Sequence, residues 1–255
     1  MNVKINKDKS IGKVLYIVEG GSTEFFILSK IFNKILDYQF ERITRTLPYK
    51  KFNSKVNPTS KVFVINTETS NIKTISKDNE FLDNLFTELI ESYDFDVNDA
   101  AIYYLFDRDP KSNTDIEFIS YMLKILKNAR DNDDYDKQGL LLLSYPSIES
   151  FTLSNFRNNS FDYTASTGDE LKDILDNERI NQSKISTKTL SFATNELLKS
   201  LERVGLLKFD IDNFGETNIK LFEHQENIYN SNGFYRALSL LCISLIDLGI
   251  IEITD

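Results

Sequence analysis

The sequence predicts an α/β fold, in which an open, mostly parallel four-stranded sheet is flanked by helices and followed by a C-terminal helical subdomain. Before residue 146, short apolar runs rich in β-branched residues alternate with longer segments that have helical spacing. Beyond residue 147 no further strand stands out. Such alternation implies parallel strands joined by right-handed crossovers. We therefore predict an α/β domain at residues 1–145 and a helical subdomain at residues 146–255.

The individual elements follow from apolar spacing and from the residues that interrupt it. The first strand, KVLYIV, is followed by two glycines and then by a helix that Ser22 or Thr23 can cap. A loop with Pro48 and Pro58 leads to the second strand, and Pro110 limits the third. Strands are predicted at 13–18, 61–66, 101–106 and 140–144. Helices are predicted at 22–35, 79–93, 116–129, 170–177, 189–204, 219–228 and 234–248.

Composition excludes several kinds of chemistry. The chain of 255 residues has one cysteine and one histidine, which rules out an internal disulfide framework and leaves no plausible zinc cluster. Carboxylates are therefore the main candidates for catalysis. The start of the chain lacks an apolar segment with a cleavage site, so we expect a cytoplasmic protein. The apolar stretch 237–251 contains Asp247 and is shorter than the roughly 20 residues that span a bilayer. It predicts a buried helix or a subunit contact, and no membrane association.

A net charge of −9 argues against non-specific coating of nucleic acid, because phosphate affinity comes mainly from lysine and arginine. Any contact with nucleic acid must then be local. Residues 40–61 carry many cations and one acid, and form either a phosphate-binding patch or an ordinary solvated loop. The candidate nucleic-acid contacts are Arg42, Arg45, Lys50, Lys51 and Lys55, with Arg108 and Lys111 beside the third strand. For Arg108 and Lys111, an exposed ion pair is the alternative.

Acidic residues stand where two of the predicted strands end. Glu19 ends the first strand, and Asp107 with Asp109 follows the third. If these strands are neighbours, about 4.8 Å apart, Glu19 and Asp107 can share one cation, and Asp109 can join them through the turn. Oxygen ligands suit Mg²⁺ or Mn²⁺, and such a metal activates water and neutralises charge on a phosphate. The ordinary alternative is that the aspartates serve only as turn residues.

The motifs VEGGSTE at 18–24 and FDRD at 106–109 resemble the two signature motifs of Toprim domains. Together with LSYPSIESF at 143–151, they are most similar to the RloB-like and AbiLii-like branch, which is related to the overcoming-lysogenisation-defect nucleases and to Toprim effectors of phage defence. The resemblance covers residues 12–156. It departs from the usual pattern at Tyr145 and Ile148, which replace an asparagine and a phenylalanine.

The resemblance implies a Toprim-like fold and a metal-dependent endonuclease that hydrolyses phosphodiester bonds of DNA or RNA, including tRNA. Glu19, Asp107 and Asp109 would be catalytic, and Glu24 and Glu149 would complete the metal ligands. Glu24 and Glu149 also have an ordinary explanation, as acids in the first turns of helices. The expected setting is a bacterial antiviral defence or abortive-infection system in which the chain works with an ATPase partner. The apolar C-terminal helix could contact that partner or a second copy of the chain.

Two other functions remain open at this point. A nucleotide-sugar transferase also uses Asp-x-Asp to hold a metal against a diphosphate, although it does not explain VEGGSTE. A subunit with this fold could also bind a partner or nucleic acid without cutting it. Topoisomerase and primase functions are disfavoured, because the chain has no room for their additional domains.

Overall fold

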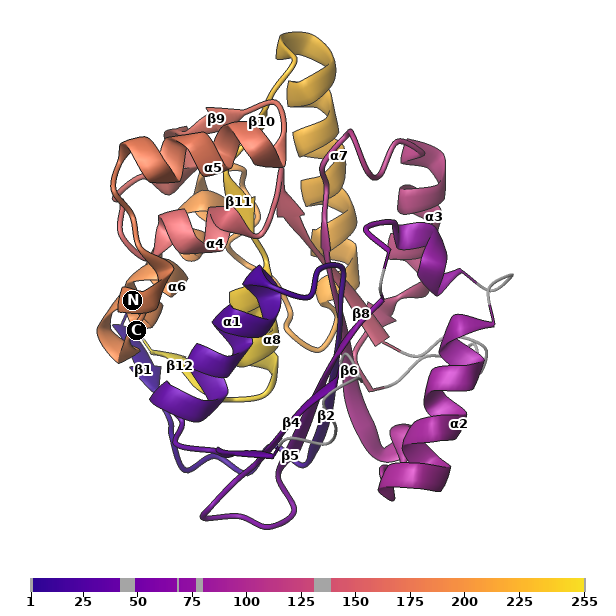
Figure 1. Cartoon of the computed structure of the whole chain (residues 1–255). Helices are drawn as coiled ribbons and strands as arrows, with labels where there is room; N and C mark the ends of the chain where they lie inside the picture. The colour runs from indigo at the N-terminus through magenta and orange to yellow at the C-terminus, as the bar shows by residue number, and fades with distance from the viewer. Residues whose placement is uncertain (1, 42–48, 68, 77–79, 131–138, 255) are drawn as a thin grey trace.

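The computed structural model describes residues 2–41, 49–67, 69–76, 80–130 and 139–254, and it has an α/β architecture with helices on both faces of a central sheet (Figure 1). The strands are β1 (Asn2–Ile5), β2 (Lys13–Val18), β3 (Gln39–Glu41), β4 (Tyr49–Asn53), β5 (Lys61–Asn66), β6 (Ala100–Asp107), β7 (Lys127–Asn128), β8 (Gly139–Tyr145), β9 (Thr164–Ala165), β10 (Tyr235–Arg236), β11 (Leu238–Ser239) and β12 (Ile251–Thr254). The helices are α1 (Thr23–Ser29), α2 (Phe81–Tyr93), α3 (Ile116–Ile125), α4 (Glu149–Ser154), α5 (Gly168–Asn177), α6 (Thr187–Arg203), α7 (Phe214–Asn232) and α8 (Leu241–Asp247).

The four predicted strands are all present and form the parallel centre of the sheet, in the order β8-β6-β2-β5. The prediction of four strands was wrong, because the sheet has eight within the described part of the chain. The antiparallel strands β4 and β3 extend it beyond β5, and β11 and β7 pair antiparallel with β8. Part of the segment predicted as a loop before β5 therefore belongs to the sheet.

Burial on both faces explains why the central strands read as apolar runs. The side chains from Val14 to Val18 are fully buried. On one face of the sheet lie α1 and α8, and on the other lie α2, α3 and α7 (Figure 1). Contacts fix the first of these layers, because the Tyr16 hydroxyl on β2 lies 2.9 Å from the Ser244 hydroxyl on α8. The helix that begins with α1 continues as a π-helical segment, Lys30–Ile35, which matches the predicted end at residue 35.

The C-terminal part is less helical than the sequence predicts. Helices α5, α6 and α7 lie where expected, but residues 234–240 contain β10 and β11, and only Leu241–Asp247 of the predicted last helix is helical. Pairing of Leu238 with Tyr145 attaches this segment to the central sheet. The apolar residues of α8 are buried, so the structure explains this stretch by packing rather than by a contact with another protein. The charge within it is also accounted for, because Asp247 binds Arg130 at 2.8 Å.

Both predicted segments contribute to one apolar core. Leu190, Leu221 and Ile243 belong to the same buried cluster as Val14 and Leu105. The two ends of the described chain also meet, because β1 pairs antiparallel with β12. A boundary between domains at residues 145 and 146 stays a prediction. Within the described residues, none of the helices combines the length and the apolar character needed to cross a membrane.

Candidate active site

The candidate site lies at the carboxyl ends of β2 and β6, which are neighbouring parallel strands. Val18 pairs with Leu105, and the Glu19 amide donates to the Leu105 carbonyl at 3.1 Å. After β2 the chain crosses to β5 on one side, and it later returns to β6 on the other side. This is a topological switch point, where ligands of open α/β sheets bind. The sheet order therefore places the ends of both acidic motifs at a position suited to a ligand.

The side chain of Glu19 contacts Asp107 directly. The Asp107 amide donates to Oε2 of Glu19 at 2.7 Å, and the Asn113 side-chain amide lies 3.4 Å from the same oxygen. Oε1 of Glu19 is 3.4 Å from the Ser112 hydroxyl. Glu19 is 6% exposed. The structure thus brings together the two acids on which the nuclease hypothesis depends, although 88 positions separate them in the sequence.

Burial and mutual repulsion make these carboxyl groups hard to ionise. Burial, and then the charge of Glu24, raise the pKa of Glu19 to about 7, against the hydrogen bond from the Asp107 amide. Burial also raises the pKa of Asp107 well above its ordinary value, and the charges of Glu19, Glu24 and Glu149 add to this effect. The four acids therefore form one electrostatic group with unbalanced negative charge.

Glu24 and Glu149 approach this group from the first turns of α1 and α4. Both are buried, with exposures of 5% and 7%. Burial, and then the charge of Glu149, raise the pKa of Glu24. Gly20 leaves space for this carboxylate, because a Cβ at this position would lie 2.7 Å from Oε2 of Glu24 and would displace it. The glycine after Glu19 therefore makes room for a carboxylate.

Asp109 lies near this group, but its carboxylate is held by backbone amides. Oδ1 accepts from Lys111 at 2.9 Å, and Oδ2 accepts from Gly168 at 2.7 Å, at the start of α5. Asp107 points elsewhere, and its Oδ1 accepts from the Ile148 amide at 2.8 Å. The two aspartates of the Asp-x-Asp motif thus make contacts with different elements. In this structure Asp109 joins the motif loop to α5.

Arg108 does not lie at the surface as a phosphate contact requires. It is 2% exposed, and its Nε and Nη2 donate to the two carboxylate oxygens of Glu226 on α7, at 2.7 and 2.9 Å. Its Nη1 donates to the Asn113 carbonyl at 2.8 Å. The alternative of an exposed ion pair is also corrected, because this pair is buried. Its effect is to hold the loop after β6, from which Asn113 reaches Glu19.

The other predicted phosphate contacts are occupied by intramolecular partners or lie outside the described residues. Arg42 and Arg45 are outside them. Lys51 pairs with Glu41 at 3.0 Å, Lys55 with Asp37 at 2.7 Å and Lys111 with Asp169 at 2.9 Å. Lys50 lies over the ring of Phe25, 4.7 Å from its centre. Most of these described lysines therefore interact with neighbouring side chains of the same chain.

The oxygen atoms of these carboxylates are suitable ligands for a divalent cation, but they do not surround a common point. No three Asp, Glu, His or Cys side chains among the described residues form a group that could hold a metal ion. Each of the two central acids nevertheless keeps one oxygen for another ligand. Oε1 of Glu19 has only the 3.4 Å contact with Ser112, and Oδ2 of Asp107 accepts no hydrogen bond from the described residues. Buried carboxylates that repel one another are typical ligands of Mg²⁺.

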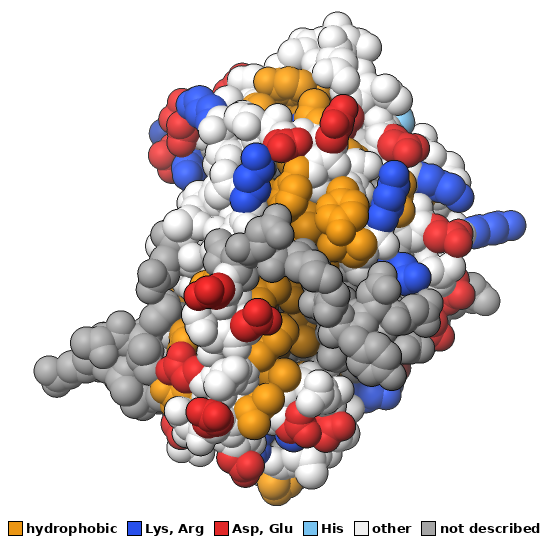
Figure 2. Space-filling model, turned by 90° about the vertical axis from the view of Figure 1, so that its right-hand side faces the viewer, with side chains coloured by type: hydrophobic (Ala, Val, Ile, Leu, Met, Phe, Trp, Pro, Cys, Tyr) orange, Lys and Arg blue, Asp and Glu red, His pale blue; other side chains and the backbone are white. Residues whose placement is uncertain are grey.

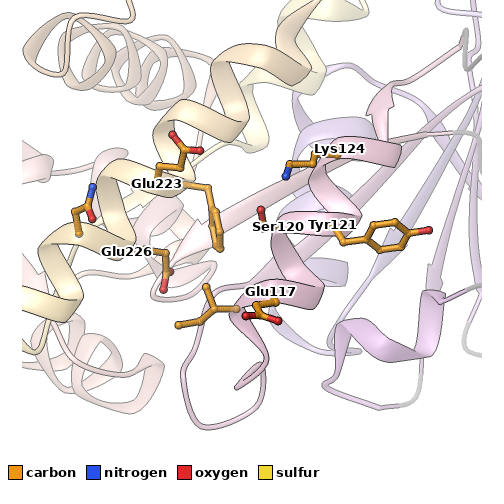
Figure 3. A pocket seen from close by; sticks show the side chains of 9 residues that line it. Glu117, Ser120, Tyr121, Lys124, Glu223 and Glu226 are labelled. Atoms are coloured by element: carbon orange, nitrogen blue, oxygen red, sulfur yellow. The ribbon is translucent and has the colours of Figure 1, made fainter.

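Of two large cavities among the described residues, only one is lined by a member of the acidic group. One, of about 550 Å³, lies between α3 and α7 and is lined by Ile116, Glu117, Ser120, Tyr121, Lys124, Phe222, Glu223, Glu226 and Asn227 (Figure 3). The side of the molecule that carries α2 and α3 shows apolar side chains between charged ones (Figure 2). None of the four acids lines this cavity, and its one link to the motif loop is Glu226, the partner of Arg108. The other, of about 460 Å³, borders the acidic group directly, because Glu149 and Thr23 line it.

The sequence reasoning missed two parts of the site. Asn113 is buried and bonds both Glu19 and the Asp107 carbonyl, the latter at 2.8 Å. Its position four residues after Asp109 in a polar loop was the available signal. The second missed part is the wall that α5 adds beside Glu149, and no motif indicated it. Comparison of the chain with protein-family models, with curated proteins and with solved structures finds no match.

Proposed function

We propose that this protein is a metal-dependent endonuclease that hydrolyses phosphodiester bonds of nucleic acid with a Toprim-like acidic site. The observation that supports this most is the contact between buried Glu19 and half-buried Asp107, two acids from the ends of adjacent strands, both with raised pKa values. Perturbed acids at a switch point of a sheet are typical of functional sites. Structural acids rarely accumulate unbalanced charge in this way.

In this proposal Glu19 and Asp107 hold the cation, with Glu24 and Glu149 beside them. A bound Mg²⁺ or Mn²⁺ would activate water and neutralise the charge that develops on the phosphate. With a pKa of about 7 in the cation-free site, Glu19 can take up or release a proton near neutral pH. The Asp107 amide and Asn113 keep its carboxylate at the strand end. Asp109 acts on the position of α5 rather than on the phosphate.

The biological setting is proposed from the motif resemblance. VEGGSTE and FDRD are similar to Toprim effectors of bacterial phage defence, which work beside an ATPase. We therefore propose an abortive-infection effector with an ATPase partner. Most of α8, in the apolar stretch considered for this contact, is buried in the fold. Co-purification with an ATPase encoded next to this chain would support this setting, and a neighbouring glycan cluster would count against it.

A second candidate function is a subunit that binds nucleic acid without cutting it. It is favoured by one observation: Glu19 and Asp107 each accept a short backbone hydrogen bond, and no three of the described acids form a metal group. The nucleotide-sugar transferase is disfavoured, because both oxygens of the Asp109 carboxylate accept from backbone amides, those of Lys111 and Gly168.

Cleavage assays separate these functions. The purified chain is incubated with plasmid, tRNA or a nucleotide sugar, with Mg²⁺, Mn²⁺ or EDTA. We expect metal-dependent cleavage of nucleic acid, and a loss of at least about a hundredfold in Glu19→Gln and Asp107→Asn. Glu202→Gln, on an exposed residue of α6, is the matched control and should keep full activity. Cleavage that survives in both site variants would refute the proposal, and binding without cleavage would favour the second candidate.

A further inference from the structure

The cavity beside the acidic group is built as a polar binding site. It measures about 460 Å³ and is lined by residues from the start of α1, from α4, from the second half of α5 and from the segment after α5. Its lining includes Thr23, Glu149, Thr152, Lys172 and Arg179. A volume of this size is typical of small-molecule sites. Since Glu149 belongs to both, a ligand in this cavity would touch the acidic group.

Thr152 supplies an independent indication of a ligand. It is 2% exposed, lines the cavity, and its hydroxyl has no hydrogen-bond partner among the described residues. Buried hydroxyl groups in native proteins nearly always have a partner, because an unpaired one is destabilising. An unpaired, enclosed hydroxyl group therefore lies in the wall of this cavity.

The cavity lining has two cations, Lys172 and Arg179, and two acids, Glu149 and Asp176, and the cations are the groups that can hold an anion. Lys172 lies on α5 and Arg179 lies two residues beyond its last residue, Asn177, and both line the cavity. Both are exposed. In the described part of the chain, Arg179 makes no ion pair, and Lys172 makes only a loose one with Asp169, at 3.9 Å. Arg179 also has a φ of +54°, a conformation uncommon for a non-glycine residue.

The charge of Lys172 reaches the acidic group. It lowers the pKa of Glu24, against the effects of burial and of Glu149. A phosphate bound at Lys172 would lie next to the acids, and the charge of Lys172 would offset the negative charge of the phosphate. The guanidinium of Arg179 suits a phosphate group, because it can donate two parallel hydrogen bonds.

We propose that this cavity binds one nucleotide of a single nucleic-acid strand, the one adjacent to the phosphodiester bond that is cut. Its phosphate lies against Lys172 and Arg179, and a polar group of its sugar or base binds the Thr152 hydroxyl. The proposal rests on the nuclease function proposed above and adds the place where the substrate strand lies. It also assigns the substrate contact to α5 and not to the basic segment around β4.

Binding without cleavage tests the two cations. Fluorescence anisotropy measures the affinity of Glu19→Gln protein, in EDTA, for a labelled strand of about 12 nucleotides. Adding Lys172→Ala and Arg179→Ala should weaken binding about tenfold or more and lower the salt slope by about 1.4, the value for two phosphate contacts on a single strand. Adding Lys208→Ala and Lys220→Ala, two exposed lysines outside the cavity lining, removes the same charge and should change affinity less than about twofold. Equal effects of the two pairs would overturn the proposal.

Thr152→Val tests the hydroxyl group. The substitution removes an unpaired buried hydroxyl and keeps the shape, so the melting temperature should stay constant or rise. Affinity for the strand should nevertheless fall about fivefold, with an unchanged salt slope. A lower melting temperature with unchanged affinity would show a structural role and overturn this part of the proposal.

Two further outcomes separate the subsite from the nuclease function and the strand from a free nucleotide. Dependence of binding on Lys172 and Arg179 without cleavage under any metal would support the subsite and refute the nuclease function. Cleavage that does not depend on these residues would support the nuclease function and refute the subsite. Adenosine monophosphate is used as a competitor, and we expect it to compete far more weakly than the strand. If it competes equally well, the ligand is a free nucleotide and the strand proposal is overturned.

Discussion

Replacing Glu19 by glutamine should stabilise the metal-free protein, and the gain should be about three times larger at pH 8 than at pH 5. The pKa of this buried carboxyl group rises from an ordinary value of 4.5 to about 7, mainly because burial disfavours its charge. The folded state then binds more protons than the unfolded state between these two values, so stability falls as the pH rises through this interval and levels off above about 7.

The expected size follows from the same interval. The change from 4.5 to about 7 corresponds to about 3 kcal/mol at pH 8, at about 1.4 kcal/mol for each tenfold change in the ionisation constant. Glutamine keeps an oxygen that can accept from the Asp107 amide, which in the wild type donates at 2.7 Å. Glu19→Gln should therefore recover most of this free energy, and Glu202→Gln should recover none.

Urea unfolding in EDTA at pH 5 and pH 8 measures the effect. The difference in unfolding free energy between Glu19→Gln and wild type should be about 1 kcal/mol at pH 5 and about 3 kcal/mol at pH 8, both in favour of the variant. A variant that is equally stable to wild type at pH 8, or less stable, would refute the reasoning, because Glu19 would then be compensated within the fold.

Two other perturbations test contacts around the site. Arg108→Met leaves Glu226 buried without its partner and should lower the free energy of unfolding by about 3–5 kcal/mol, measured in urea. The double variant with Glu226→Leu should recover most of that loss. Equal instability of the single and double variants would contradict the pairing of these two residues. Gly20→Ala places a methyl group 2.7 Å from the present position of a Glu24 oxygen, so the variant should cleave about tenfold more slowly or worse. Its melting temperature should stay within a few degrees of that of the wild type. Full activity of this variant would show that the position of Glu24 is not needed for cleavage.

The sequence predicted those parts of the fold that depend on local patterns. The strands at 13–18 and 61–66 were predicted with their observed bounds, because both are buried on two faces and bounded by polar or glycine residues. The antiparallel strands β3 and β11 were missed, since they are short and form only through pairing with distant residues. Likewise, the apolar stretch 234–248 was predicted as one helix, because apolar content alone does not separate a strand from a helix.

The site was predictable only in part for a similar reason. Acids at strand ends are visible in a sequence, and the structure brings Glu19 and Asp107 into contact. Side-chain alternation along β6 could have placed Arg108 on the opposite face from Asp107. Its partner Glu226, however, lies 118 positions later, and no local pattern indicates such a pairing. Thr152 was missed because an unpaired hydroxyl is a property of packing, which a sequence does not display.

The order of strands in the sheet has a consequence for how the chain can be divided. The strands β2 and β6 are neighbours in the sheet but are separated by β5 and α2 along the chain. Cutting the polypeptide between α2 and β6 therefore leaves Glu19 and Asp107 on different fragments. Neither fragment then has both acids, and the acidic site forms again only when the two fragments pair along β2 and β6. Such a split pair offers a way to switch the acidic centre on by bringing two halves together.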